Sequence, residues 1–174
     1  MELKGVVLWF FLAIIVINGH GSHEEKENSV LCRQCGREIS SPDLLRVSPL
    51  SPFVLEKHNR TMFGSSLSVP VERLRNPAGV EFSVITFTKA GCEGVGAWTS
   101  EHTWYPGHSW RVCLCPQCGQ HMGWMFEPEH SDNLDTLDKP SSAGFYALIV
   151  NKVIDENFAN SITMTSHAKY AGKI

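Results

Sequence analysis

The sequence predicts a mainly β domain whose distant parts are joined by a metal site. Residues 55–69 and 80–90 are rich in β-branched and aromatic residues, and the turn-forming stretch from Asn76 to Gly79 lies between them. In the second segment, large or branched side chains occupy both alternating positions, so both faces of that strand should be covered. Two Cys-x-x-Cys motifs flank these segments, and 174 residues suit one domain with a single core.

Weaker patterns complete the expected order of elements. Ser41 to Leu45 can form one helical turn, Glu127 to Ser142 is a polar loop, and Phe145 to Ile154 is an apolar closing strand. The domain is therefore expected over residues 31–155. The remaining residues, 156–174, should form a flexible tail without regular structure.

The N-terminal residues 1–21 have the pattern of a secretory signal peptide. An uninterrupted apolar run extends from Val6 to Ile17, and Gly19 and Gly21 supply small residues before the cleavage point. The run is shorter than the roughly 20 residues that a membrane-spanning helix needs. A retained amphipathic anchor is the alternative, but the run has no polar face. We expect a secreted mature protein outside the membrane, which begins with a polar leader at 22–30.

The charge of the chain gives no indication of a nucleic-acid partner. The formal net charge is −3 and the pI is near 6.2. No lysine and arginine cluster forms the basic patch that phosphate binding requires. We expect a monomer that does not bind nucleic acid.

The two short cysteine motifs have the spacing of metal-binding knuckles. They are Cys32-x-x-Cys35 and Cys115-x-x-Cys118, and a glycine follows each. Two thiolates three positions apart can occupy adjacent corners of a tetrahedral metal, and the glycine lets backbone N–H groups turn toward sulfur. About 80 residues separate the motifs, far more than in a small finger. The pattern favours a closed four-cysteine zinc site that joins two ends of a domain; disulfide bonds are the alternative in a secreted chain.

Aromatic residues and histidines are concentrated between Glu101 and Phe126, EHTWYPGHSWRVCLCPQCGQHMGWMF. Trp104, Trp110 and Trp124 lie there among prolines and glycines, which allow turns and close backbone approach. Each buried indole N–H needs a hydrogen-bond partner, so several together are awkward in a core. A tryptophan-walled pocket is one interpretation, and an aromatic core beside the metal site is the other.

The chain resembles the CULT domain family in the order of its motifs: Cys-x-x-Cys, Asn-Pro-x-Gly, Glu-His-Thr-Trp-Tyr-Pro-Gly-His-Ser-Trp, Cys-x-x-Cys and His-Met-Gly-Trp-Met-Phe. This family includes the thalidomide-binding domain of cereblon and single-domain secreted proteins. The similarity covers roughly Leu31 to Ile154, and the Trp-x-Pro-Gly-x-x-Trp core is specific. It implies a β-tent, in which two antiparallel sheets meet at an angle and the four-cysteine zinc pins the apex.

The resemblance also implies a small-molecule pocket. Its three tryptophans would be the walls, the phenylalanine the base, the histidine a hydrogen-bonding partner of the ligand, and the Asn-Pro pair the loop over the mouth. His108 departs from the family pattern, which has an aromatic residue there, so a more polar rim is expected. The positions that match the lining are Asn76, Pro77, His102, Trp104, Trp110, Trp124 and Phe126.

A neutral cyclic imide or a uracil-like ring suits such a pocket. Its flat ring can be buried between indoles, and its N–H and two C=O groups can pair with a backbone carbonyl, a backbone N–H and an imidazole. Each hydrogen bond that is missed in a dry pocket costs about 1–3 kcal/mol, which rejects plain lactams. No segment resembles the parts through which cereblon joins a ubiquitin ligase, so no such partner is expected.

Three other interpretations stay open. Methionine sulfoxide reductases of one type share the β-tent and both knuckles, but they need a nucleophilic cysteine beyond the second knuckle, and none follows Cys118. A low-pKa thiol at Cys92 or Cys113 would be needed instead, without a named base. The aromatic residues could also hold a cation by cation–π attraction. A purely structural domain with a tryptophan core is the last alternative.

Two features depend on entry into the secretory pathway. Cys92 and Cys113 remain after the knuckles are assigned, and on neighbouring strands in an oxidising compartment they are expected to form a disulfide. Asn59-Arg60-Thr61 is an N-glycosylation sequon. We expect the disulfide to stiffen the rim of the pocket and Asn59 to carry a glycan.

Overall fold

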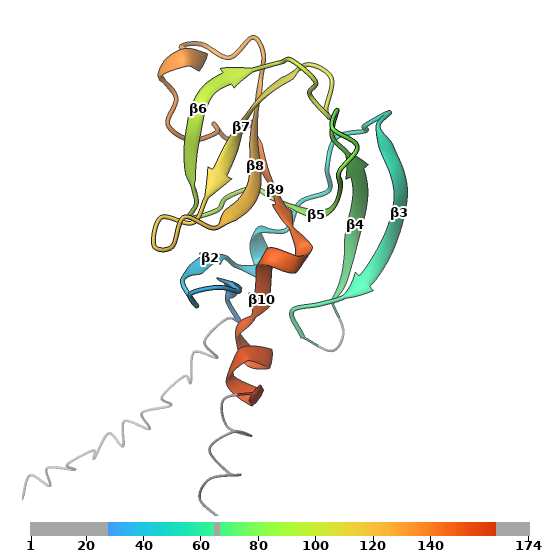
Figure 1. The fold of residues 1–174 in the computed structure, drawn as a ribbon, viewed down its shortest axis with the longest axis vertical. Coiled ribbons are helices and arrows are strands. Elements are labelled where there is room, and N and C mark those ends of the chain that lie inside the picture. Colours follow the sequence, from blue (N-terminus) through green and yellow to red (C-terminus); the bar gives the residue numbers. More distant parts are fainter. Residues whose placement is uncertain (1–27, 65–66, 163–174) are drawn as a thin grey trace, which may run out of the picture.

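The computed structural model describes residues 28–64 and 67–162 (Figure 1). The predicted signal peptide, most of the polar leader and residues 163–174 of the predicted tail lie outside the described residues. Within the described part, no helix has the length and apolar character needed to cross a bilayer.

Antiparallel strands dominate the described residues and form two sheets. The larger sheet has the order β3-β4-β5-β9-β8-β7-β6, and the smaller has the order β10-β1-β2. This confirms the predicted mainly β class with two antiparallel sheets. The larger sheet contains β3 (Val54–Thr61), β4 (Ser68–Arg75), β5 (Glu81–Phe87), β6 (Glu93–Thr99), β7 (His108–Leu114), β8 (His121–Pro128) and β9 (Phe145–Ile149). The smaller contains β1 (Val30–Cys32), β2 (Glu38–Ser40) and β10 (Val153–Asp155).

The predicted turn at 76–79 joins β4 to β5. The backbone N–H of Asn76 donates to the carbonyl of Val80 at 2.9 Å, and the Asn76 side chain accepts a hydrogen bond from the N–H of Val80 at 2.8 Å. Gly79 adopts a φ of +82°, which glycine tolerates. The last four residues of β5 are all buried, so both faces of this strand are covered as expected.

The predicted single closing strand, Phe145 to Ile154, is wrong in one respect. β9 ends at Ile149, and a short 3-10 helix, η3 (Val150–Lys152), turns the chain before β10. β9 pairs with β5 and β8, whereas β10 pairs with β1. An apolar run does not show where a strand changes partner, so the sequence could not distinguish one strand from two.

The chain after β10 is also more regular than expected. Residues 156–162 are helical, and the Asp155 carboxylate accepts a hydrogen bond from the N–H of Phe158 at 3.0 Å. This is an N-cap, which supplies one of the free N–H groups at a helix start. The expectation of no regular structure is therefore wrong for these residues.

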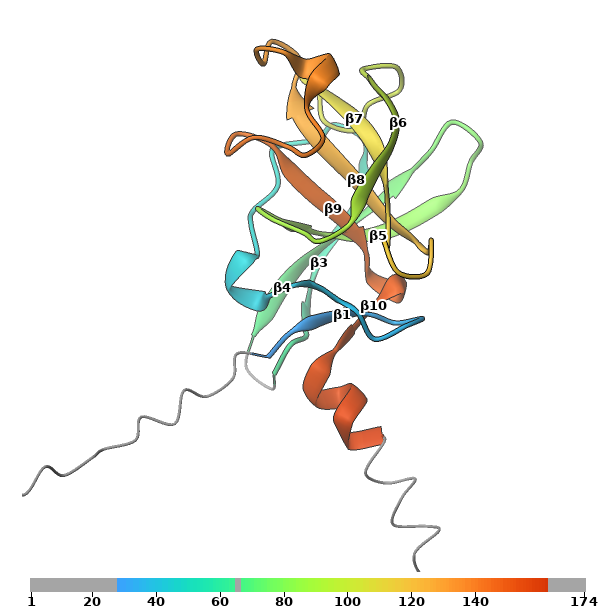
Figure 2. The ribbon, with the colours of Figure 1, turned by 90° about the vertical axis from the view of Figure 1, so that its left-hand side faces the viewer.

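Two further expected elements can be compared with the structure. The helical turn at Ser41 to Leu45 is present as η1 (Pro42–Leu44). The loop expected from Glu127 begins later, because β8 extends to Pro128, and it contains η2 (Leu134–Thr136). Figures 1 and 2 show η2 at the top of the molecule and the smaller sheet below the larger one.

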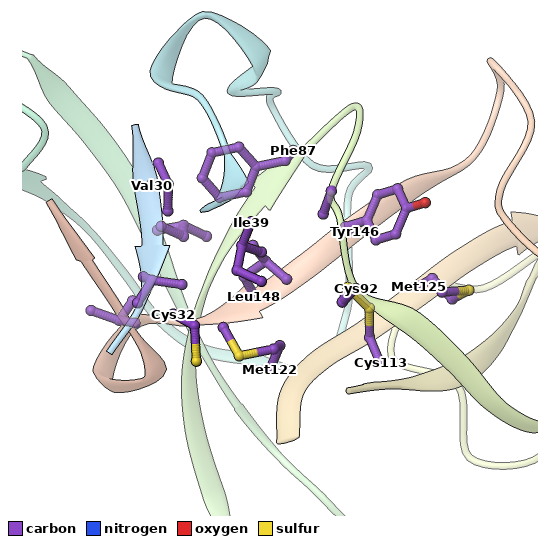
Figure 3. Packing of buried hydrophobic residues seen from close by; sticks show 14 of the residues in the cluster. Val30, Cys32, Ile39, Phe87, Cys92, Cys113, Met122, Met125, Tyr146 and Leu148 are labelled. Carbon is purple, nitrogen blue, oxygen red and sulfur yellow. A yellow bond between two sulfur atoms is a disulfide. The ribbon is translucent and has the colours of Figure 1, made fainter. Parts of the chain in front are cut away.

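The larger sheet separates two apolar clusters. Along β9, Tyr146 and Leu148 belong to one cluster, and Phe145, Ala147 and Ile149 belong to the other, as the two-residue period of a strand requires. The first cluster packs the larger sheet against the smaller one. Figure 3 shows its members Val30, Cys32, Ile39, Phe87, Cys92, Cys113, Met122 and Leu148. The second cluster is rich in aromatic residues, which are Trp104, Tyr105, Trp124, Phe126 and Phe145.

Gly123 breaks the alternation of β8. The pairing of β7 with β8 changes register next to it, and Gly123 has a φ of +146°. As a result Met122 faces the first cluster while Trp124, two residues later, faces the second. A β-bulge therefore directs Trp124 to the aromatic face.

Replacement of Gly123 by alanine should strongly destabilise the domain. A Cβ at this position would overlap the carbonyl oxygen of Ala147 on β9, which is backbone and cannot move aside. We expect a loss of about 3 kcal/mol in the free energy of unfolding, measured by denaturant titration.

Gly94→Ala is the matched control, because Gly94 lies on β6 of the same sheet. A Cβ there would meet only the side-chain ends of Arg111 and Met125, at 3.0 Å, and these can shift. An equal loss of stability in the two variants would contradict the argument.

Candidate metal centre and aromatic cavity

The four knuckle cysteines lie together in one cluster. Their sulfur atoms are all within 4.8 Å of one another. The Sγ atoms of Cys32 and Cys118 are 3.7 Å apart, and those of Cys35 and Cys115 are 3.6 Å apart. Four sulfurs at about 2.3 Å from one tetrahedral zinc would be about 3.8 Å from each other. The cluster therefore fits a structural zinc ion, as predicted.

Both knuckles have the same backbone geometry. In each, the N–H of the trailing glycine donates to the carbonyl of the first cysteine, at 2.9 Å in one knuckle and 2.8 Å in the other. Gly36 and Gly119 adopt φ values of +75° and +69°, a conformation that favours glycine. The glycine after each motif is thus a requirement of the turn.

The cluster connects the two sheets. Cys32 ends β1 and Cys35 lies in the turn to β2, both in the smaller sheet. Cys115 and Cys118 lie in the turn between β7 and β8 of the larger sheet. A metal bound here would hold the sheets together at this point.

The ionisation of the thiols is unequal. Burial raises the pKa of Cys115, but the backbone N–H groups of Gln117 and Cys118 outweigh burial and lower that pKa to about 7. Burial raises the pKa of the Cys32 thiol. Four adjacent thiols cannot all become thiolates without a cation to balance them, which is the role a bound zinc ion would have.

The other two cysteines form the predicted disulfide. Cys92 precedes β6 and Cys113 lies on β7, and their Cα atoms are 5.5 Å apart. Both are completely buried in the first apolar cluster. The disulfide therefore lies in the core between the sheets. The expectation that it stiffens the rim of a pocket is wrong, because the cavity lies on the opposite, aromatic face of the larger sheet.

One cavity of about 240 Å³ lies on the aromatic face. It is lined by the seven residues that were expected to surround a pocket. They come from β7, β8, the β4–β5 turn and the segment between β6 and β7. The lining residues are Asn76, Pro77, His102, Trp104, Trp110, Trp124 and Phe126.

Two of the tryptophans are fixed by strand pairing. Trp110 on β7 is opposite Phe126 on β8, and Trp124 is opposite Val112. The indole N–H of Trp110 donates to the carbonyl of Glu101 at 2.9 Å. Trp104 lies outside the strands, and its N–H donates to the carbonyl of Arg75 at 3.0 Å. With these N–H groups paired, both indoles offer carbon surfaces to the cavity.

Trp124 is packed on several sides. Its ring centroid is 4.6 Å from that of Trp104, with an angle of 68° between the ring planes. Phe82 and His121 contact it at centroid distances of 4.9 and 4.7 Å. These edge-on contacts hold Trp124 in place. The third wall, Trp110, is only half-buried.

The polar lining residues differ in whether their side chains are available to bind a ligand. The side chain of Asn76 is already used in the β4–β5 turn. His102 adopts a φ of +56°, is exposed, and its Nε2 is 3.5 Å from a carboxylate oxygen of Glu101. The ring of His108 packs 5.5 Å from that of Phe145 and does not line the cavity, so the expected polar rim at this residue is wrong.

Sequence reasoning missed four residues around the site. Phe82 and His121 support Trp124 from outside the cavity, and burial lowers the pKa of His121. Tyr105 is completely buried beside Trp104, and its hydroxyl donates to Glu72 at 2.9 Å. The only signal for this pair was a charged residue at an otherwise apolar position of β4, SVPVERLR, which is weak evidence without a known partner.

The fold and the two sites define a mainly β domain with a closed four-cysteine metal centre and a separate aromatic cavity. Comparison with known proteins finds similarity to cereblon. The chain is 36% identical to protein cereblon of Gallus gallus over 72 residues, which cover 41% of this chain and 16% of that protein. It is 33% identical to protein cereblon of Danio rerio over 106 residues, which cover 60% of this chain and 21% of that protein.

These matches support the resemblance to the cereblon CULT domain. The match in Xenopus tropicalis has the same extent as that in Gallus gallus. The aligned part is about a fifth or less of the length of these curated relatives. No family model matches the sequence.

Loss of any one knuckle cysteine should abolish metal binding. Cys118→Ser removes one of four thiolates and leaves the fourth position to a serine hydroxyl or water, which are much weaker zinc ligands than a thiolate. We expect one zinc per chain in the wild type and none in the variant, measured by native mass spectrometry, with a marked loss of stability.

The control is the double variant Cys92→Ser/Cys113→Ser, which should retain zinc because the disulfide lies outside the metal cluster. Detection of Cys32–Cys35 or Cys115–Cys118 disulfides in metal-free protein would contradict the zinc assignment.

Proposed function

We propose that this chain is a secreted, zinc-stabilised binding protein for a small neutral ring, such as a cyclic imide or uracil. The main support is the cavity itself: the residues implied by the CULT resemblance surround one space of about 240 Å³. That volume is below the range of pockets for drug-sized molecules and suits a single six-membered ring.

The lining favours a neutral ligand over a cation. No carboxylate belongs to the described residues that line the cavity. Cation cages rely on ring faces, and a nearby negative charge would strengthen them. The indole N–H of Trp124 has no acceptor among the described residues, so one donor remains for a ligand carbonyl or for water.

His102 and the β4–β5 turn would supply the polar contacts. The exposed His102 imidazole can donate to a second carbonyl, and its left-handed backbone can present a peptide group to the cavity. Asn76 and Pro77 line the cavity from a short turn, and as the loop over its mouth they would limit access. A ring with one N–H between two carbonyls would satisfy these groups together.

The arrangement of cysteines argues against thiol catalysis. Cys32, Cys35, Cys115 and Cys118 form the metal cluster, and Cys92 and Cys113 are joined. These are all six cysteines of the sequence. A sulfoxide reductase needs a free thiolate nucleophile, so we propose binding without catalysis.

A ligand titration tests this function. Trp110→Ala removes the wall that is least needed for packing, and we expect about a tenfold or greater loss of affinity for uracil and glutarimide. Tryptophan fluorescence should report a Kd that is roughly micromolar in the wild type, because so small a ligand has few contacts. N-methylation of the imide should abolish binding, because it removes the donor and adds bulk.

Trp98→Phe is the matched control. Trp98 lies on β6 outside the cavity, where its N–H donates to the carbonyl of Leu137. This variant should bind like the wild type. Equal binding of the N-methylated imide, or competition by a choline analogue, would refute the neutral-imide proposal.

Secretion and glycosylation form a second, separate test. Asn59 is exposed on β3, an edge strand of the larger sheet, so a glycan there would meet no packed neighbour. In secreting cells we expect the protein in the medium, with a mass that falls on treatment with an N-glycosidase.

Asn59→Gln should remove that mass shift, and Thr61→Ser should retain it because serine still completes the sequon. Retention inside the cell would contradict secretion, and an unshifted wild-type mass in the medium would contradict the glycan.

A further inference from the structure

Trp104 is held differently from the other two tryptophan walls. Trp110 and Trp124 lie on β7 and β8, whose ladder fixes their separation. Trp104 belongs to the segment between β6 and β7, outside any strand. Some other interaction must therefore hold Trp104 at its distance from Trp124.

The contacts of this segment lead to β4 and the chain before β3. The indole N–H of Trp104 donates to the carbonyl of Arg75, the last residue of β4. The hydroxyl of Ser51 donates to the carbonyl of Trp104 at 2.5 Å. Both contacts are single hydrogen bonds that involve Trp104 itself, and the next residue, Tyr105, adds a third contact.

Tyr105 supplies that third contact. Its ring is fully buried, with centroids 4.8 Å from Phe126 and 5.0 Å from Phe145. Its hydroxyl donates to Oε2 of Glu72 at 2.9 Å. Burial, together with the negative charge of Glu72, raises the pKa of Tyr105 far above its ordinary value, so the hydroxyl stays a donor.

Glu72 connects three segments of the chain through one carboxylate. It is 4% exposed, and its second oxygen accepts hydrogen bonds from Ser48 Oγ at 2.6 Å and Lys57 Nζ at 2.9 Å. These donors come from the chain before β3 and from β3 itself. A buried carboxylate with all its donors in place fixes their relative positions strongly.

We propose that Glu72 is a positioning residue for ligand binding, which acts through Tyr105 to hold Trp104 as the third wall of the cavity. Glu72 does not line the cavity. Its loss would lower the fraction of molecules in which Trp104 stands at the cavity. The ligand readout of this proposal rests on the proposed function.

A positioning role has a distinct signature. When only a fraction of the protein is competent to bind, the apparent Kd of every ligand rises by the same factor. A residue that contacts the ligand would instead affect uracil and glutarimide differently. The comparison of two ligands therefore separates positioning from contact.

The test uses Tyr105→Phe, which keeps the packed ring and removes only the hydroxyl, and Glu72→Gln as a second variant. We expect binding of uracil and of glutarimide to weaken by one common factor, about tenfold, because a hydrogen bond to a buried carboxylate is lost. In protein labelled with 5-fluorotryptophan, the ¹⁹F resonance of Trp104, assigned with Trp104→Phe, should shift or broaden.

Glu127→Gln is the matched control. Glu127 is equally buried and accepts hydrogen bonds from Ser131 and Ser141, but it anchors the loop after β8. It should leave both Kd values and the Trp104 resonance unchanged.

Wild-type affinity in Tyr105→Phe, unequal factors for the two ligands, or the same ¹⁹F change in Glu127→Gln would overturn the proposal. If the wild type binds neither ligand, the proposed function fails. The ¹⁹F spectrum then decides the positioning role alone, and an unchanged Trp104 signal overturns it.

Discussion

The four-cysteine cluster is the constraint on which the rest of the structure depends. The smaller sheet consists of three strands of three residues each, too little to remain folded alone. Its attachment to the larger sheet relies on a few buried side chains, such as Val30 and Ile39, and on sulfurs within 4.8 Å of one another. A metal there also fixes the turn from which β8 starts, three residues after Cys118, and β8 carries Trp124 and Phe126. Metal binding at the start of β8 thus helps to set the position of the cavity base near the end of the same strand.

The two faces of the larger sheet keep the sulfur-containing core and the aromatic cavity apart. Tyr146 and Leu148 face the sulfur-containing core, and Phe145 and Ala147 face the aromatic cluster. Strict alternation along β8 would have placed Met122 and Trp124 on the same side. The bulge at Gly123 prevents this. One glycine therefore allows a strand to contribute to the metal-side core at its start and to the cavity afterwards.

The metal knuckles could be predicted because each is local in sequence, whereas the cavity lining could be predicted only through the resemblance to the CULT family. The Cys-x-x-Cys-Gly pattern by itself predicts the turn of each knuckle. The two cysteines outside these motifs then predict the disulfide. The division between β9 and β10 could not be predicted, because both are apolar and only the partner strand distinguishes them. The link between Tyr105 and Glu72 is equally hidden, since the two residues are 33 positions apart and a buried carboxylate is recognised only by its donors. The location of the disulfide, away from the cavity, depends on which face of β7 Cys113 occupies.

The cavity combines a rigid part with a part that is held by side chains. Trp110, Trp124 and Phe126 belong to paired strands, so the ladder fixes the positions of their backbone. Trp104 is held by single hydrogen bonds to Arg75 and Ser51 and by the buried anchor at Tyr105. Each of these bonds contributes about 1 kcal/mol, far less than a strand pairing in total. Any widening of the cavity for a larger ring would therefore occur at Trp104, and the ladder of β7 and β8 would set the lower limit of its size.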